Sequence, residues 1–195
     1  MNTKIFMALF AISTIIGCSK EEDEVIAPAK VYAEENPLSG YISNSGFNQM
    51  TTNFINAGSY EFGLRFTPKV KGKINAVTVK IPDNATTLRV TIWDADAKTV
   101  LKTVNIANVL TNTEKTETIE PLTLQKDGHY AITFNSNDWY NRTKTGNAAA
   151  SYPITVGNIV IDGYNWLSGT TQTFPTGVSN TYYAGDLSFV FQQMD

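Results

Sequence analysis

From about Ser39 to the C-terminus, short runs of apolar residues alternate with polar or small ones, and this period of two is the strongest constraint on the fold. Successive side chains of a β-strand point to opposite faces, so apolar residues at every second position mark a strand with one face in a core. The apolar positions of the six clearest runs are Phe62, Leu64 and Phe66; Val77, Val79 and Ile81; Leu88, Val90 and Ile92; Val104 and Ile106; Tyr130, Ile132 and Phe134; and Leu187, Phe189 and Phe191. Each run is predicted to form a half-buried strand.

Turn-forming residues separate these runs, as in Pro82-Asp83-Asn84 and Lys126-Asp127-Gly128. No window of a dozen residues after Cys18 has apolar residues at helical spacing. Strands about ten residues apart, joined by short turns, are typical of an all-β sandwich. We therefore expect residues 39–195 to form one all-β domain, a single antiparallel two-sheet β-sandwich of jelly-roll-like form.

Several motifs along these runs occur together in one known family. They are Tyr60-Glu61-Phe62-Gly63-Leu64-Arg65-Phe66-Thr67, Lys73-Ile74-Asn75-Ala76-Val77, Val90-Thr91-Ile92-Trp93-Asp94 with Val100-Leu101, Glu120-Pro121-Leu122-Thr123-Leu124, Asp127-Gly128-His129-Tyr130, Phe174-Pro175-Thr176 and Leu187-Ser188-Phe189-Val190-Phe191. From about Tyr41 onward the chain thus resembles the extracellular family named domain of unknown function 4082, although it lacks the Gly that members often carry in the Trp-Asp turn. The resemblance implies a secreted or surface β-sandwich, of a kind often found beside sugar-active or adhesive modules, and it brings no catalytic residues.

The N-terminal residues have the pattern of a bacterial lipoprotein signal. Lys4 precedes an apolar stretch that is too short to span a bilayer but long enough for a signal peptide. The stretch ends in Ile15-Ile16-Gly17-Cys18, which resembles a lipobox with Ile15 at the usual Leu position. We expect residues 1–17 to be a cleaved signal peptide and Cys18, the only Cys of the chain, to be lipidated and to anchor the protein in a membrane.

Residues 18–38 are predicted to be the lipidated Cys followed by an acidic flexible linker, because they contain two Pro and six acidic residues and have no sustained periodicity. The run Ser19-Lys20-Glu21-Glu22-Asp23-Glu24 resembles the signal that exports some lipoproteins to the outer face of the outer membrane. The alternative is a solvated charge run that only keeps the tether off the lipid. We expect an outer-membrane protein that faces the cell exterior.

The charge distribution excludes a nucleic-acid-binding surface. Six of the 18 acidic residues precede residue 36, and the remainder of the chain is neutral, with 12 acidic and 12 basic residues. Binding to phosphates requires clustered Lys and Arg, and no such cluster is present. A single Cys and a single His also exclude a disulfide scaffold and a multi-histidine metal site.

No motif in the sequence indicates an enzyme. Asp94-Ala95-Asp96 begins like a calcium loop but lacks the required Gly and Glu, so it is predicted to be a hairpin turn capped by Asp94. The stretch from Gly58 to Gly63 has phosphate-loop spacing, but Leu64 stands where a Lys is required. His129 has no second His or nearby nucleophile and is predicted to be a surface side chain. We expect no catalytic residue, metal or cofactor, while a structural calcium bound through carbonyl oxygens remains open.

Aromatic residues flanked by amides and charges are the best binding candidates. Trp139 and Tyr140 lie in the predicted loop 137–142, and Tyr164 and Trp166 follow the predicted turn at Asp162-Gly163. Such rings can stack on a sugar while amides and carboxylates bind its hydroxyls, and the alternative is a Trp lid packed over the end of the sandwich. We expect both Trp side chains to lie at one end of the domain and to be partly exposed, whereas Trp93 is predicted to be structural.

The sequence as a whole predicts a non-catalytic cell-surface lipoprotein whose β-sandwich binds a glycan or a surface protein. An alternative is a structural or accessory subunit of an outer-membrane uptake or adhesion complex. A glycan hydrolase is less favoured, because it needs two carboxylates facing each other across a cleft and no acidic residue lies in a recognisable catalytic motif.

Overall fold

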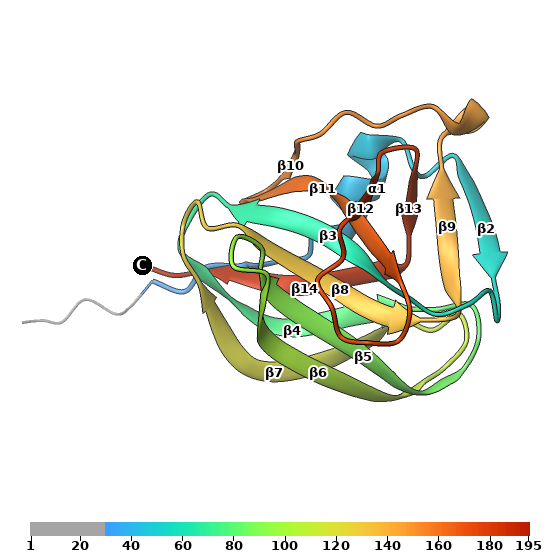
Figure 1. Ribbon diagram of the computed structural model, residues 1–195. Coiled ribbons are helices and arrows are strands. Elements are labelled where there is room, and N and C mark those ends of the chain that lie inside the picture. Colours follow the sequence, from blue (N-terminus) through green and yellow to red (C-terminus); the bar gives the residue numbers. More distant parts are fainter. Residues whose placement is uncertain (1–29) are drawn as a thin grey trace, which may run out of the picture.

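The computed structural model describes residues 30–195, which consist almost entirely of antiparallel β-strands (Figure 1). The elements are β1 (Glu34–Glu35), α1 (Leu38–Ser45), β2 (Met50–Phe54), β3 (Tyr60–Pro68), β4 (Gly72–Lys80), β5 (Ala85–Asp94), β6 (Thr99–Val109), β7 (Lys115–Leu124), β8 (Tyr130–Ser136), β9 (Trp139–Thr143), the 3₁₀ turn η1 (Thr145–Asn147), β10 (Ile154–Val156), β11 (Ile159–Ser168), β12 (Gly177–Ser179), β13 (Tyr182–Ala184) and β14 (Asp186–Gln193). The predicted signal peptide 1–17, Cys18 and the acidic run after it lie outside the described residues. The predicted all-β antiparallel fold class is confirmed.

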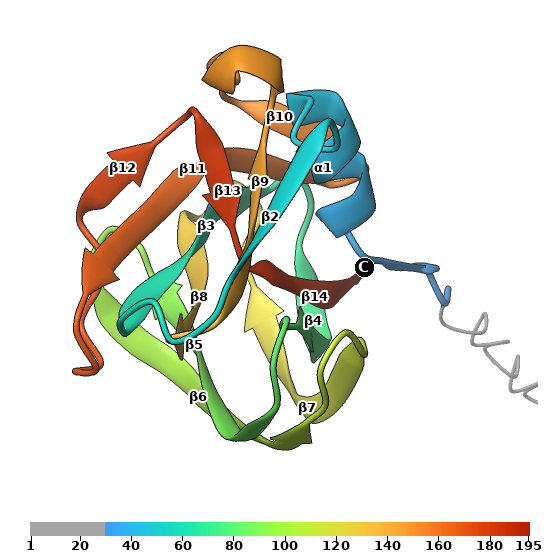
Figure 2. The ribbon, with the colours of Figure 1, turned by 90° about the vertical axis from the view of Figure 1, so that its right-hand side faces the viewer.

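The strands form two main sheets and one small sheet. The large sheet has the order β10-β11-β3-β8-β5-β6, with β12 also paired to β11, and the second sheet has the order β1-β14-β4-β7. The small sheet β13-β9-β2 covers one end of the molecule and faces the viewer in Figure 2. A third sheet was not expected from the sequence. It forms because β8 continues into β9 after Ser136, and β13 leads through Gly185 into β14.

The core lies between the large sheet and the four-stranded sheet, as the alternation predicted. All apolar positions of the six predicted runs are buried. Across the two sheets, the ring centroids of Phe66 on β3 and Phe189 on β14 lie 4.4 Å apart. Side chains of this kind, removed from water, provide most of the favourable free energy of folding.

Several polar residues on the opposite face of β3, β5 and β8 are also buried, so the prediction that only one face of these strands is buried is wrong. Glu61 is 1% exposed, and Thr91 and Thr133 are completely buried. They are covered by residues 169–176, an irregular segment between β11 and β12 that we call the strap.

Side chains of the large sheet hold the strap in place. Asn135 donates a hydrogen bond to the carbonyl of Gly169 at 2.9 Å, and Arg89 donates to the carbonyl of Thr170 at 3.1 Å. Further along, the amide of Gln172 donates to the hydroxyls of Thr91 and Thr103 at 3.1 and 2.7 Å. The Phe174 ring meets the Trp93 ring edge-on, with the centroids 5.7 Å apart. The outer face of the sheet therefore becomes a second, more polar interior.

A buried ion pair lies beneath the strap. A terminal nitrogen of Arg89 is 2.7 Å from the Glu61 carboxylate, which also accepts a hydrogen bond from the Thr133 hydroxyl. The indole N–H of Trp93 donates in turn to Thr133 at 2.8 Å. A buried carboxylate is tolerated only when it is paired and hydrogen-bonded in this way.

The folded domain begins earlier than the predicted boundary at Ser39. Strand β1 pairs with β14, and the Glu35 carboxylate accepts a hydrogen bond from the Asn158 backbone N–H at 2.8 Å. Helix α1 follows directly, and Gly46, with φ of 78°, ends it. At eight residues α1 is too short to give helical spacing of apolar residues over a dozen positions. Its Tyr41 is buried and meets the Tyr183 ring edge-on at 5.1 Å.

The chain enters the described region at the end of the molecule that also holds the C-terminus, and the small sheet lies at the other end (Figure 1). Among residues 30–195, no helix has the length and apolar character needed to cross a membrane.

The ion pair beneath the strap gives the first prediction. Arg89→Met removes the only cation within ion-pair distance of Glu61 among residues 30–195 and leaves its carboxylate buried. Loss of one partner of a buried pair costs about 3 to 5 kcal/mol, and we expect the lower end because the Arg89 side chain is 24% exposed. Thermal unfolding should show a fall in Tm of roughly 6 to 12 °C.

Two further variants test the cause of that loss. Adding Glu61→Gln to Arg89→Met removes the unpaired charge and should recover part of the lost Tm. Lys126→Met removes a cation whose side chain is 64% exposed and should change Tm little. If Arg89→Met costs no more than Lys126→Met, the ion pair contributes nothing to stability.

Candidate functional site

Three of the four predicted aromatic residues meet at one pocket, but they lie on strands rather than in loops. Trp139 is the first residue of β9, where it pairs with Phe54 of β2. Tyr164 and Trp166 lie on β11 and pair with Leu64 and Phe62 of β3. The polar residues around these rings suggested loops in the sequence, but backbone pairing to neighbouring strands holds both segments extended.

Their side chains line a cavity of about 340 Å³ between the small sheet and one end of the large sheet. Seven aromatic residues surround most of it: Phe54, Tyr60, Phe62, Trp139, Tyr164, Trp166 and Tyr182. Asn141, two residues after Trp139 on the same face of β9, supplies an amide. We call this cavity the aromatic pocket.

The rings of the aromatic pocket hold one another in place. Trp139 stacks on Phe54, with the ring centroids 5.4 Å apart and the planes 7° from parallel. Tyr60 meets Trp139 edge-on at 5.4 Å and Trp166 at 6.2 Å. Tyr164 meets Tyr182 edge-on at 5.4 Å. Such contacts stabilise ring pairs by about 0.5 to 1.5 kcal/mol beyond their burial, so the pocket is preformed.

The pocket has buried and more exposed members. Trp139 is 9% exposed and Tyr164 is 2% exposed, whereas Tyr60, Trp166 and Tyr182 are half-buried. The prediction of partial exposure therefore describes Trp166 but is wrong for Trp139, because Phe54 of the small sheet covers the Trp139 ring. Burial raises the pKa of the Tyr164 and Tyr182 hydroxyls, so both stay protonated at neutral pH.

Tyr140 does not belong to the aromatic pocket. Alternation along β9 directs it to the face opposite Trp139, where its hydroxyl donates a hydrogen bond to the side-chain oxygen of Asn112. Its ring lies beneath the Lys80 ammonium, 5.8 Å from nitrogen to centroid. Sequence proximity to Trp139 thus suggested a role that the strand geometry excludes.

Two contacts hold β9 of the small sheet against β14. Arg142 on β9 donates two hydrogen bonds to the Asp186 carboxylate, at 2.6 and 2.7 Å. The N–H of Gly185 donates to the carbonyl of Tyr140 at 2.9 Å. Gly185 has a φ of 97°, and a Cβ there would collide with the Phe134 ring, so this corner requires Gly.

Sequence reasoning missed the other six residues of the pocket, although it placed Phe62 in the core: Phe54, Tyr60, Phe62, Asn141, Tyr182 and Ala184. Tyr60 could have been found, because it lies two residues before Phe62 and therefore on the same face of the predicted strand. Phe54 and Tyr182 could not, because their places depend on the pairing of β2 and β13 with β9.

Other residues singled out in the sequence have structural positions. The Asp94 carboxylate accepts the backbone N–H groups of Asp96 and Ala97 at 3.0 and 2.8 Å, so the predicted capped turn is confirmed. The His129 side chain is 59% exposed, as predicted, and a hydrogen bond to Asp96 raises its pKa. Trp93 packs in the interior beneath the strap. Within residues 30–195, no group of three or more His, Cys, Asp and Glu side chains could hold a metal ion.

Comparison with known protein families gives one match. A family model described as "Domain of unknown function (DUF4082)" matches residues 47–184, well over half of the chain. This range contains the described core strands from β2 to β13 and every residue of the aromatic pocket. A search of curated proteins found no match.

The different burial of the two Trp residues leads to a prediction about stability. Truncating a buried Trp to Ala costs about 3 to 5 kcal/mol, so Trp139→Ala should lower Tm by roughly 6 to 20 °C. Trp166→Ala should lower Tm by less than half as much, because its ring is only half-buried. Thermal unfolding of both variants measures this, with buried Trp93→Ala as the reference for a core Trp. An equal fall in Tm for Trp139→Ala and Trp166→Ala would contradict the prediction that Trp139 contributes more to stability than Trp166.

Proposed function

The chain belongs to the DUF4082 family, and on that basis we propose that it is a non-catalytic surface lipoprotein whose domain binds a carbohydrate in the aromatic pocket. The observation that carries the proposal is the convergence of Tyr60, Trp166 and Tyr182, all half-buried, around a preformed cavity. Sugar rings present C–H groups on their faces and hydroxyls at their edges. Aromatic side chains with one apolar body and one polar tip fit that combination.

The size and lining of the pocket support a small ligand. Its volume of about 340 Å³ falls in the range of about 300 to 1,000 Å³ that is usual for small-molecule sites. The Asn141 amide and the protonated Tyr182 hydroxyl provide hydrogen bonds, and the Trp166 ring provides a flat surface. Such pockets bind through apolar contact and use a few polar groups for orientation.

The lining also supports binding without catalysis. Among the described residues, no Asp, Glu or His lines the aromatic pocket. Hydrolysis of a glycosidic bond needs two carboxylates on either side of the bond, one as an acid and one as a base or nucleophile. The pocket therefore provides stacking surfaces and hydrogen bonds but no carboxylate pair of the kind that glycosidases use.

The position of the pocket fits a tethered protein. The described part of the chain begins at the end of the molecule opposite the small sheet that borders the pocket (Figure 1). We propose that lipidated Cys18 and the linker after it join the domain to the outer membrane from this end, facing the exterior. The pocket would then point away from the lipid surface.

A protein partner, as in an uptake or adhesion complex, is the second candidate. Strand β2 is the edge of the small sheet, and all five of its residues are exposed, with Met50 50% and Phe54 38% exposed. An edge strand with unpaired backbone groups can accept a strand from another protein. Phe54 of β2 also lines the aromatic pocket but Met50 does not, so a substitution at Met50 can separate the two candidates.

Carbohydrate binding is tested with a glycan array on the purified protein, followed by calorimetry on any sugar that binds. Trp166→Ala and Tyr182→Ala should each weaken that binding by roughly 30-fold, the effect of losing about 2 kcal/mol from an aromatic anchor. Tyr32→Ala, which removes an aromatic ring near the opposite end, should leave the affinity unchanged. Binding that survives both pocket variants, or is lost on Met50→Pro in β2 instead, would refute the pocket as the carbohydrate site.

Lipidation and display are tested on intact cells of a bacterial host that exports lipoproteins to its surface. A clickable fatty acid should label the wild-type protein, and Cys18→Ser should remove the label. Protease added to the intact cells should cleave the labelled wild-type domain. Equal labelling of both proteins would exclude lipidation at Cys18, and protection of the labelled domain would exclude an exterior position.

A further inference from the structure

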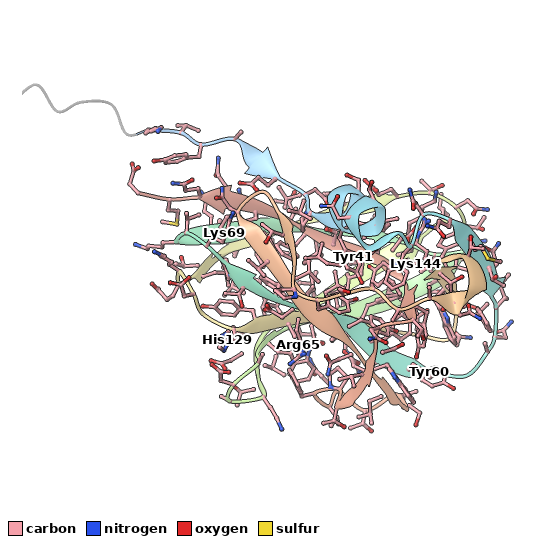
Figure 3. All side chains as sticks on the ribbon, turned by 90° about the horizontal axis from the view of Figure 1, so that it is seen from above. Tyr41, Tyr60, Arg65, Lys69, His129 and Lys144 are labelled. Atoms are coloured by element: carbon pink, nitrogen blue, oxygen red, sulfur yellow. The ribbon has the colours of Figure 1, made fainter. Side chains whose placement is uncertain are left out.

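A second hollow, of about 410 Å³, lies on the outer face of the large sheet at the edge of the strap. It is lined by Arg65 of β3, His129 before β8, and Asp162 and Asn165 of β11, with Lys98 in the turn between β5 and β6. In Figure 3, Arg65 and His129 lie close together on one side of the molecule. We call this cavity the arginine hollow.

The arginine hollow and the aromatic pocket lie on opposite faces of the same strands. Along β11, Tyr164 and Trp166 line the aromatic pocket, and Asn165 between them lines the arginine hollow. Alternation of the strand separates the two cavities, so a ligand in one does not contact the other.

Arg65 differs from the other two arginines of the chain. Arg89 and Arg142 lie 2.7 and 2.6 Å from the carboxylates of Glu61 and Asp186. Within residues 30–195, no carboxylate lies within ion-pair distance of Arg65, and its Nε, like that of Arg89, is buried without a hydrogen-bond partner. A buried donor without an acceptor destabilises the folded state, and more so when it is charged. A ligand that supplies the acceptor would recover this cost.

The backbone around Arg65 makes room for its guanidinium. A bulge in β11 between Ile161 and Gly163 places Gly163 opposite Arg65. A Cβ at Gly163 would lie only 2.9 Å from Nη2 of Arg65. Any larger residue at position 163 would therefore displace the guanidinium from its place at the hollow.

The arginine hollow also contains side-chain oxygens that can accept further hydrogen bonds. Asn165 is 5% exposed, and its amide nitrogen donates to the carbonyl of Pro175 at 3.0 Å, but its Oδ1 has no hydrogen-bond partner within residues 30–195. Asp162 accepts one hydrogen bond, from the Thr67 hydroxyl at 2.7 Å, and its remaining lone pairs can accept others. The hollow thus combines an unpaired planar cation with oxygens that need hydroxyl or amide donors.

We propose that the arginine hollow binds a uronic acid, with the sugar carboxylate on Arg65 and the sugar hydroxyls on Asn165 and Asp162. Arginine binds a carboxylate through two parallel hydrogen bonds, which matches the planar group of a uronic acid. A phosphate or sulfate dianion fits less well, because the carboxylates of Asp96 and Asp162 at the hollow would repel it. A single negative charge next to several hydroxyls satisfies both the cation and the acceptors.

Calorimetry with the purified protein tests the proposal, with tri-galacturonic acid as the probe and galactotriose as its neutral counterpart. The acidic trimer should bind at least tenfold more tightly than the neutral one. Arg65→Lys keeps the charge but loses the two parallel bonds, and Gly163→Ala displaces the guanidinium, so each should weaken binding at least tenfold. Trp166→Ala, in the aromatic pocket, should leave this binding unchanged, which separates the present site from the proposed carbohydrate site.

A measurement on the wild-type protein keeps the test valid even if a variant does not fold. Tri-galacturonic acid should shift the NMR signal of the Arg65 Nε–H and that of the single histidine, His129. Absence of any shift at millimolar concentration, or equal affinity for galactotriose, would overturn the proposal. So would tenfold tighter binding of N-acetyl-trialanine, because a peptide carboxylate would then be the preferred ligand.

Discussion

The strap can cover the outer face of the large sheet because of the ion pair between Glu61 and Arg89, whose charged atoms lie 2.7 Å apart beneath it. Without Arg89, a buried charge would lie in the middle of β3, and the strap could not cover it without loss of stability. Because the charge is balanced and Thr133 also donates to it, the polar face of the sheet can be enclosed. The arginine hollow lies at the edge of the strap. Within residues 30–195, Arg65 has no carboxylate partner of the kind that Glu61 provides for Arg89.

Strand alternation then distributes the functional candidates between two faces. On β3, Phe62 faces the aromatic pocket and Arg65 faces the arginine hollow. On β11, Trp166 and Asn165 divide in the same way. The same sheet thus presents an aromatic surface on one side and a charged, hydrogen-bonding surface on the other. Both proposed sites would take sugars, but through different chemistry: ring stacking in one and charge pairing in the other.

The aromatic pocket exists because the small sheet is fixed over the end of the large one. The paired hydrogen bonds from Arg142 to Asp186 and the Gly185 corner tie β9 and β13 to β14. This attachment brings Phe54 onto Trp139, which turns an expected exposed ring into a buried wall of the pocket. Trp166, on β11 of the large sheet, keeps part of its ring open.

The sequence alone determined the six core strands with clear alternation and their inward faces, because the period of two depends only on local backbone geometry and on the burial of apolar side chains. It also singled out Trp139, Tyr164 and Trp166, whose side chains line one cavity, and Asp94 as a turn cap. Only the tertiary structure revealed the small sheet, the removal of Tyr140 from the site, and the strap that buries Glu61. Each of these depends on contacts between residues far apart in the chain, such as Phe54 with Trp139 or Thr170 with Arg89, and no local pattern encodes which distant segments will meet.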